Sequence, residues 1–289
     1  MLIYHRPDTL AEALALRAGG DVVVLSGGTD VFPAKAARAG WGDMQHKDVL
    51  DISALRGLDG IVEEEAYWRI GALTTWTELI EAELPPLFAG YQLAAREIGG
   101  VQIQNCGTLV GNICTASPAG DGAPNLLALQ AEVELKSVDG SRRLPLAAFI
   151  NGYRHTACRS DEIVTAILVP KRGGAARGHF RKLGARKYLV ISIVMVAGVV
   201  ETDAAGTIVA CTLAVGACSP VPQRLAGLEA ALLGVPLAAA SAHVGAEHLS
   251  ALSPIDDIRA SAAYRRAAAL TLARDLLADL AGAAAGRAC

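Results

Sequence analysis

Residues 103–125 read IQNCGTLVGNICTASPAGDGAPN, and this stretch decides the fold. It is rich in glycine and in side chains that form hydrogen bonds, yet apolar residues are interleaved throughout. Such interleaving favours a backbone packed inside the protein, where its polar groups need partners. A long surface loop is the alternative. The stretch predicts a ligand-binding loop with donors at Gly107, Thr108, Gly111, Asn112, Thr115 and Ser117, and at Asp121 an acceptor suited to ribose hydroxyls or an adenine amine.

A second glycine-rich segment, VVVLSGGTDV at residues 22–31, lies near the N-terminus. Gly27 and Gly28 follow a short β-branched run and precede a helix-like stretch at 31–40. A turn of this kind can point backbone N–H groups at an anion. Neither the dinucleotide fingerprint GxGxxG nor the P-loop pattern is matched, so an ordinary turn is the alternative. Together, two donor-rich loops fit a ligand with a pyrophosphate and several hydroxyls.

The composition of the 289-residue chain excludes several classes of protein. The net charge of −3 provides no basic field for nucleic acid. The longest apolar run, Leu189–Val200, is much shorter than the roughly twenty residues of a membrane span. It is rich in Val and Ile, which favours a buried strand. Because the N-terminus also lacks the apolar core of a signal peptide, we expect a cytoplasmic protein without a membrane span.

Motifs for direct catalysis are absent from the sequence. The six cysteines are irregularly spaced and include no CxxC pair, so we expect free thiols and no metal site built by this chain. No Ser-His-Asp spacing, GxSxG elbow or HExxH helix occurs. If the chain is part of an enzyme, a cofactor is expected to perform the chemistry.

The hydrophobic pattern predicts a mixed first part and a strand-then-helix second part. Capping boxes at Thr9–Glu12 and Thr75–Glu78 begin two helices. Strands are predicted at 21–25, 48–53, 67–73 and 161–170, with a hairpin turn at Asp139–Gly140. The glycine-rich segment 171–178 is the best linker candidate. Beyond it, three antiparallel strands within 178–184, 189–203 and 206–218 precede a helical end, so an α+β protein is predicted.

The chain resembles the FAD-binding (medium) subunit of molybdenum hydroxylases, the xanthine dehydrogenase and carbon monoxide dehydrogenase family. The resemblance covers nearly the whole chain and rests on motifs that occur in the family's order. They are YHRPDTLAEAL (4–14), VVVLSGGTDV (22–31), IGGVQIQNCGTLVGNICTASPAGDGAPNLLAL (98–129), GYR (152–154), DEIVTAILVP (161–170), FRKLGARK (180–187) and DIRASAAYRRAAALTLARDLL (257–277).

The resemblance implies an α+β fold with two domains. Residues 1–172 would form a two-lobed FAD-binding domain of the vanillyl-alcohol-oxidase type, with lobes at about 1–56 and 57–172. Residues 176–286 would form a small C-terminal α+β domain, like that of the carbon monoxide dehydrogenase flavoprotein, with a three-stranded antiparallel sheet and helices.

The resemblance also implies which residues bind FAD. The first loop would wrap the pyrophosphate and part of the flavin side with Val24, Leu25, Ser26, Gly27, Gly28, Thr29, Asp30 and Val31. Thr108, Gly111 and Asn112 would bind the diphosphate and ribityl region, and Asp121 the adenosine end. Val164 would offer a main-chain contact, and Lys182 would lie near the isoalloxazine, where positive charge favours the anionic reduced flavin. Ile98 and Thr115 complete the implied set.

The implied function is electron transfer. In relatives, a large molybdopterin subunit hydroxylates the substrate, and electrons pass through two [2Fe–2S] clusters of a small subunit to FAD. FAD then reduces NAD or another acceptor. The expected assembly is a heterotrimer, whose further dimerisation is left open. Alternatives are a stand-alone FAD-dependent oxidoreductase of the same fold and a nucleotide-binding assembly protein.

The chain departs from the family pattern in two places. Val110 stands where many relatives have a glycine in the second loop. Leu189 and Val190 stand where the xanthine dehydrogenases that use NAD carry acidic residues, so the sequence leaves the electron acceptor open.

Overall fold

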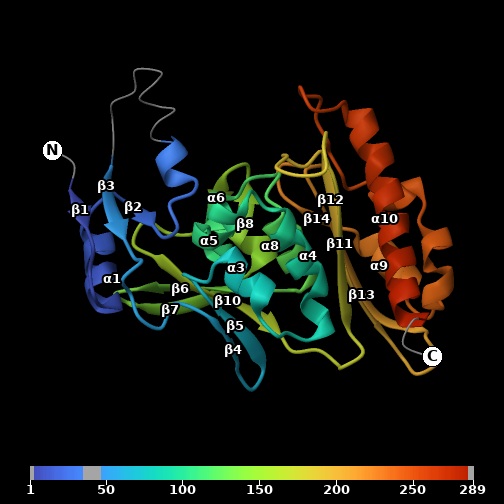
Figure 1. The fold of residues 1–289 in the computed structure, drawn as a ribbon, viewed down its shortest axis with the longest axis horizontal. Helices are drawn as coiled ribbons and strands as arrows, with labels where there is room; N and C mark the ends of the chain where they lie inside the picture. The colour runs from blue at the N-terminus through green and yellow to red at the C-terminus, as the bar shows by residue number, and fades with distance from the viewer. Residues whose placement is uncertain (1–2, 35–46, 286–289) are drawn as a thin grey trace.

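The computed structural model describes residues 3–34 and 47–285, and Figure 1 shows three sheets side by side along the long axis of the molecule. The first lobe is a parallel sheet in the order β1 (Tyr4–His5), β3 (Asp48–Asp51), β2 (Val22–Leu25). Helix α1 (Leu10–Gly19) links β1 to β2 and begins at the predicted Thr9–Glu12 capping box. Residues 31–34 are helical, and the rest of the helix predicted at 31–40 lies outside the described residues.

The second lobe is a five-stranded antiparallel sheet under a layer of short helices. Its strands run in the order β4 (Ile61–Glu63), β5 (Tyr67–Gly71), β10 (Ile163–Pro170), β6 (Glu132–Ser137), β7 (Gly140–Pro145). The central strand β10 is buried from Ile163 to Val169. The layer contains α3 (Trp76–Glu81), η1 (Pro86–Phe88), α4 (Ala89–Glu97), α8 (Leu146–Phe149) and the small hairpin β8 (Ile150–Gly152) and β9 (His155–Thr156). Helix α3 begins at the second predicted capping box, Thr75–Glu78.

Residues 103–125 are largely helical, so the prediction of a loop is wrong. The chain forms α5 (Val101–Cys106), α6 (Leu109–Thr115) and α7 (Gly122–Ala128). Thr108 caps α6 by accepting a hydrogen bond from the Gly111 N–H at 3.0 Å. Leu109 and Ile113, four residues apart, are both fully buried and mark the core face of this helix. The helices are too short, and too rich in glycine, for sequence periodicity to reveal them.

The C-terminal region packs one sheet between two layers of helices. The sheet runs in the order β11 (Arg177–Leu183), β12 (Val194–Thr202), β13 (Ile208–Gly216), β14 (Gln223–Arg224). In Figure 1 it stands nearly edge-on, with α4 on one side and α10 (Ala262–Ala285) on the other. Helix α9 (Ala226–Leu232) and the turns η2 (Leu237–His243) and η3 (Ala246–Leu249) complete the outer layer. The sheet has four strands and not the predicted three, because the two-residue β14 pairs with the end of β13.

Strand β12 is buried on both faces, which explains the long apolar run in the sequence. Met195, Ala197 and Val199 belong to the core of the second lobe. The residues that alternate with them, Val194 and Val196, belong to the core beneath α10. A strand covered on both sides reads as a continuous apolar segment. The predicted strand is confirmed, and no helix in the described residues is long and apolar enough to cross a membrane.

Helix α4 lies directly on β11 because a glycine in each element leaves room for the other's backbone. A Cβ at Gly90 would lie 2.7 Å from the carbonyl oxygen of His179. A Cβ at Gly178 would overlap the carbonyl oxygen of Leu87, in the turn η1 just before α4, and would lie 3.2 Å from the backbone nitrogen of Gly90. This close packing fixes the second lobe against the C-terminal sheet.

Replacement of Gly90 by alanine tests this contact. We expect Gly90→Ala to lower the free energy of unfolding by about 1–3 kcal/mol, because the added methyl overpacks the contact with His179. The matched control is Gly227→Ala on α9, where an added Cβ would have nothing within 4 Å. That variant should be neutral or stabilising by about 0.5–1 kcal/mol. Urea unfolding of the two variants measures the difference, and equal effects would contradict the packing argument.

Candidate cofactor site

The two glycine-rich segments meet in one cavity of about 490 Å³. The Thr108 hydroxyl lies 3.0 Å from the Ser26 hydroxyl, which joins segments 82 residues apart in the chain. Gly27 lies so close to the second segment that a Cβ there would overlap the carbonyl oxygen of Cys106. Gly28 has a φ of +71°, a conformation that glycine adopts without strain. The two glycine-rich segments therefore form the two walls of one cradle.

Most of the predicted site residues line this cavity. They are Val24, Ser26, Gly27, Gly28, Thr29, Asp30, Val31, Ile98, Thr108, Gly111, Asn112 and Thr115. Leu25 is buried and does not line it. Gly107 and Ser117, which sequence reasoning named as donors, also line it.

Val164 lines an adjoining cavity of about 310 Å³. The two cavities share four wall residues, Val24, Ser26, Gly111 and Cys114. A β-bulge between Val164 and Ala166 interrupts the pairing of β10 with β6, so the backbone at Val164 departs from the regular ladder. Val110 is 4 % exposed and lines this adjoining cavity, not the main one. The valine therefore does not obstruct the cradle, which accounts for its presence in a glycine-rich loop.

Asp121 and Lys182 form a buried ion pair of 2.6 Å, with both side chains about 5 % exposed. Ser192 donates a second hydrogen bond to the Asp121 carboxylate at 2.5 Å. Burial raises the pKa of Asp121, and these two partners oppose that effect. Neither residue of the pair lines the main cavity. The predicted contacts of Asp121 with the adenosine end of FAD and of Lys182 with the isoalloxazine stay predictions, and the contact between the two side chains favours positions at the same part of an extended cofactor.

Trp76 and Arg154 also line the cavity, and neither is among the site residues predicted from the sequence. Trp76 is 2 % exposed and packs edge-on against Tyr91, so it forms a rigid apolar wall. Arg154 has a φ of +48° and a loose ion pair of 3.7 Å with Asp30. Trp76 carried no signal beyond its place beside a capping box, whereas Arg154 ends the GYR motif.

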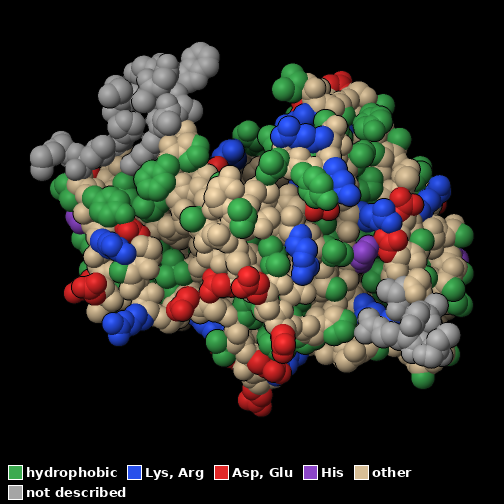
Figure 2. Space-filling view, in the orientation of Figure 1, with side chains coloured by type: hydrophobic (Ala, Val, Ile, Leu, Met, Phe, Trp, Pro, Cys, Tyr) green, Lys and Arg blue, Asp and Glu red, His purple; other side chains and the backbone are tan. Residues whose placement is uncertain are grey.

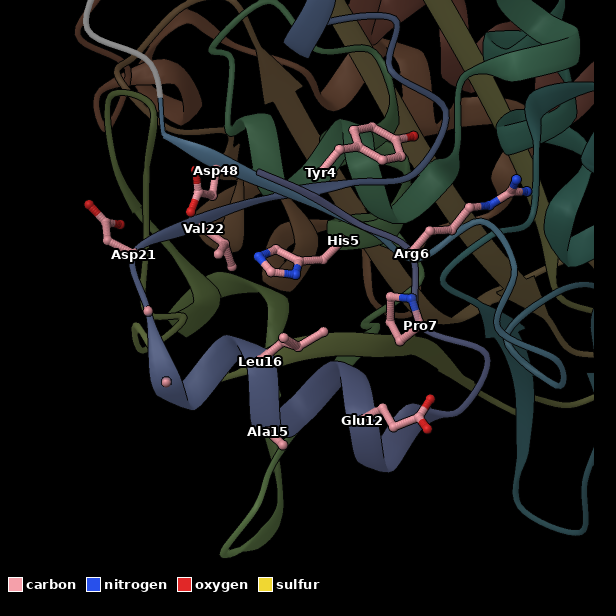
Figure 3. A pocket seen from close by; sticks show the side chains of 12 residues that line it. Tyr4, His5, Arg6, Pro7, Glu12, Ala15, Leu16, Asp21, Val22 and Asp48 are labelled. Atoms are coloured by element: carbon pink, nitrogen blue, oxygen red, sulfur yellow. The ribbon is translucent and has the colours of Figure 1, made fainter. Parts of the chain in front are cut away.

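A larger surface hollow, of about 820 Å³, lies on the first lobe (Figure 3). There α1 and the strands β1 and β2 surround it, and His5 and Leu16 extend toward its centre. Three carboxylates, Glu12, Asp21 and Asp48, line it. Arg6 also lines it and Lys47 pairs with Asp21 at 2.7 Å, but the three carboxylates still leave an acidic excess that disfavours a diphosphate. The cavity between the two glycine-rich segments is therefore the better nucleotide site.

FAD fits the residues of the cavity between the two glycine-rich segments. Asn112 Oδ1 is buried with no hydrogen-bond partner among the described residues, and a ribityl hydroxyl could donate to it. A Cβ at Gly111 would lie 2.7 Å from the Thr108 hydroxyl, so only glycine leaves room there for the hydroxyl that caps α6 and contacts Ser26.

The fold and the cavity define a two-lobed nucleotide-binding protein with an attached sheet-and-helix region. Residues 1–172 match the FAD binding domain in molybdopterin dehydrogenase, and residues 179–280 match the CO dehydrogenase flavoprotein C-terminal domain. The chain belongs to the family of FAD-binding medium subunits of molybdenum hydroxylases.

Named relatives and solved structures agree with this assignment. The chain is 34 % identical to the nicotinate dehydrogenase FAD-subunit of Eubacterium barkeri, over 81 % of this chain and 80 % of that one. It is 32 % identical to the xanthine dehydrogenase FAD-binding subunit of Escherichia coli O157:H7, over 98 % and 97 %. A carbon monoxide dehydrogenase structure from Hydrogenophaga pseudoflava superposes with a TM-score of 0.86 at 28 % identity, over 98 % and 97 %. The predicted fold class and family are therefore confirmed.

Loss of the Thr108 hydroxyl should loosen the cradle. We expect Thr108→Val to lower the FAD content of the purified chain well below that of the wild type, because the link to Ser26 and the cap of α6 are both lost. The control is Thr9→Val, which removes a comparable cap of about 1 kcal/mol from α1. Flavin absorbance per chain is the measurement, and equal retention in both variants would contradict a bridging role.

A double-mutant cycle tests the buried ion pair. Lys182→Met should destabilise the fold by about 3–5 kcal/mol, because it leaves the Asp121 carboxylate buried without its cation. The double variant Asp121→Asn, Lys182→Met should recover most of this loss. Denaturant unfolding gives both values. A double variant as unstable as the single one would show that Lys182 has a different role.

Proposed function

We propose that this chain carries electrons from the [2Fe–2S] clusters of a small partner subunit, through FAD, to an external acceptor. The observation that carries the proposal is the chemistry of the cavity wall. Among the described residues that line the cavity, only Asp30 and Arg154 are charged, and their side chains form an ion pair of 3.7 Å. The wall thus offers donors that hold a cofactor and no separate acid and base to act on a substrate.

Bound FAD supplies the redox chemistry. The chain's own residues would hold and orient it. The Thr108–Ser26 contact keeps the two glycine-rich segments together, and Asn112 Oδ1 offers a buried hydrogen-bond acceptor. We assign the positive charge near the flavin to Arg154 in place of Lys182, because Arg154 lines the cavity and Lys182 is paired with Asp121. Positive charge there would favour the reduced, anionic cofactor.

The family and the names of the relatives support an assembly with two kinds of partner. Relatives are described as FAD or medium subunits, and one solved structure is a Cu,Mo-CO dehydrogenase. We propose a small iron–sulfur partner and a large molybdopterin partner for this chain as well, with the substrate bound by the large one. The five described cysteines are free, which supports assembly in a reducing compartment such as the cytoplasm.

Co-purification tests this function. Expressed together with a small iron–sulfur subunit and a large molybdopterin subunit from its own source, the chain should elute in one complex with about one FAD per copy and with iron and molybdenum present. Reduction of the clusters should then bleach the flavin band near its visible maximum. A chain without flavin would favour the nucleotide-binding assembly protein, and a partner-free chain that oxidises a small substrate would favour the stand-alone oxidoreductase. Either result would overturn the proposal.

A further inference from the structure

One side chain of the first lobe forms hydrogen bonds to the backbone of both lobes. Arg17, in the last turn of α1, donates from Nε to the carbonyl oxygen of Glu162 at 3.2 Å and from Nη1 to that of Val22 at 2.5 Å. Val22 begins β2 in the first lobe, and Glu162 directly precedes β10 in the second. A single guanidinium therefore joins segments that are 145 residues apart in the chain.

This contact lies beside the adjoining cavity of about 310 Å³, which Arg17, Val22 and Glu162 all line. None of the three lines the cavity between the two glycine-rich segments, here called the cofactor cavity. The contact of Ser26 with Thr108 lies where the two cavities meet, because Ser26 lines both. Since Ser26 directly follows β2, the second lobe holds this strand at both of its ends. One contact alone would let the lobes pivot about it, whereas two contacts at different points prevent that rotation.

The acceptor in the second lobe is itself firmly held. Glu162 is 4 % exposed, and its carboxylate accepts from Arg142 Nε at 2.5 Å, from Arg142 Nη2 at 2.8 Å and from the backbone N–H of Arg159 at 2.7 Å. Burial works to raise the pKa of Glu162, but these donors outweigh it and keep the pKa below its usual value. The carboxylate therefore stays charged and paired at neutral pH, and the backbone of Glu162 offers Arg17 an acceptor in a fixed place.

Apolar contacts also join the two lobes, but they fix the separation less strictly. Leu14 and Val22 of the first lobe belong to the same core as Ile163 of β10. Hydrophobic contacts have no preferred direction, so side chains in such a core can shift past one another. The guanidinium of Arg17 is planar and rigid, and its donors demand acceptors at defined positions. Arg17 therefore defines the distance between the walls of the adjoining cavity.

Replacement of Arg17 would leave no carboxylate without its partner. Among the described residues, Arg17 forms no ion pair, and the nearby Glu162 carboxylate is bound by Arg142. Loss of the guanidinium therefore removes two hydrogen bonds to carbonyl oxygens and strands no buried charge, which is the costlier event. A variant at this position is expected to fold.

We propose that Arg17 is a positioning residue of the FAD site, which holds the two lobes at a fixed separation and so preforms the cofactor cavity. The proposal rests on the function proposed above only for the identity of the cofactor. Supporting residues of this kind keep the groups that touch a ligand in place, and a preformed site loses less entropy when the ligand binds. The role falls to a residue that lies outside both glycine-rich segments and does not line the cofactor cavity.

Titration of the FAD-free, full-length chain with FAD tests the proposal. Arg17→Met keeps the apolar stem of the side chain and removes its donors. We expect it to raise the dissociation constant of FAD, measured by isothermal titration calorimetry, by at least about tenfold. A tenfold change corresponds to about 1.4 kcal/mol, which lies within what hydrogen bonds to a charged group contribute. At saturating FAD, the visible circular dichroism of the bound flavin should also change, because the walls of its site would no longer be held at the same separation.

Arg274→Met is the matched control. Arg274 of α10 likewise donates two hydrogen bonds to a backbone carbonyl, that of Val244, at 3.0 and 2.8 Å, and it lines neither cavity. This variant should bind FAD within about twofold of the wild type and leave the flavin spectrum unchanged, and urea unfolding of the FAD-free chains reports what each variant costs the fold. The inference is overturned if Arg17→Met binds FAD as tightly as the wild type, or if Arg274→Met weakens binding and alters the spectrum equally. A wild-type chain that binds no FAD would instead overturn the proposed function.

Discussion

The contact between the Thr108 and Ser26 hydroxyls is the interaction on which the site depends. It joins the first lobe to the helix layer of the second, and neither lobe alone could enclose a dinucleotide. Thr108 also caps α6, so the same oxygen that joins the loops fixes the helix behind them. Because Gly27 faces the carbonyl of Cys106 at close range, the two walls have little freedom to separate. Such preorganisation lowers the entropy that the two walls must lose when a cofactor binds.

Local features of the fold could be predicted from the sequence, because their causes lie within a few residues. The capping boxes at Thr9 and Thr75 depend on a three-residue spacing and are both present. Strand β12 was predicted because burial on both faces leaves a continuous apolar run. Most of the cradle was also predicted, since its residues are contiguous in two motifs that resemble a family.

The remaining features depend on contacts between distant residues. Lys182 lies 61 residues from Asp121, and nothing in either motif indicates that the two side chains pair. Strand β14 exists only because β13 is beside it, and a two-residue strand has no periodicity of its own. Arg154 joins the cavity through the position of a short hairpin, which sequence spacing does not encode. Figure 2 shows acidic side chains gathered at the lower tip of the molecule, where Figure 1 places the turn between β4 and β5.

The double burial of β12 has a consequence for how this chain can vary. Its odd-numbered residues from 195 to 199 face one core, and the even-numbered Val194 and Val196 face the other. A single-residue insertion or deletion within the strand would shift the residues beyond it by one position and send their side chains into the wrong core. Length changes are therefore confined to the loops at either end of the strand, including the segment that carries Ile191. The length of β12 is therefore fixed by the two cores that it separates, and residues can be added or removed in the flanking loops without disturbing the register of the sheet.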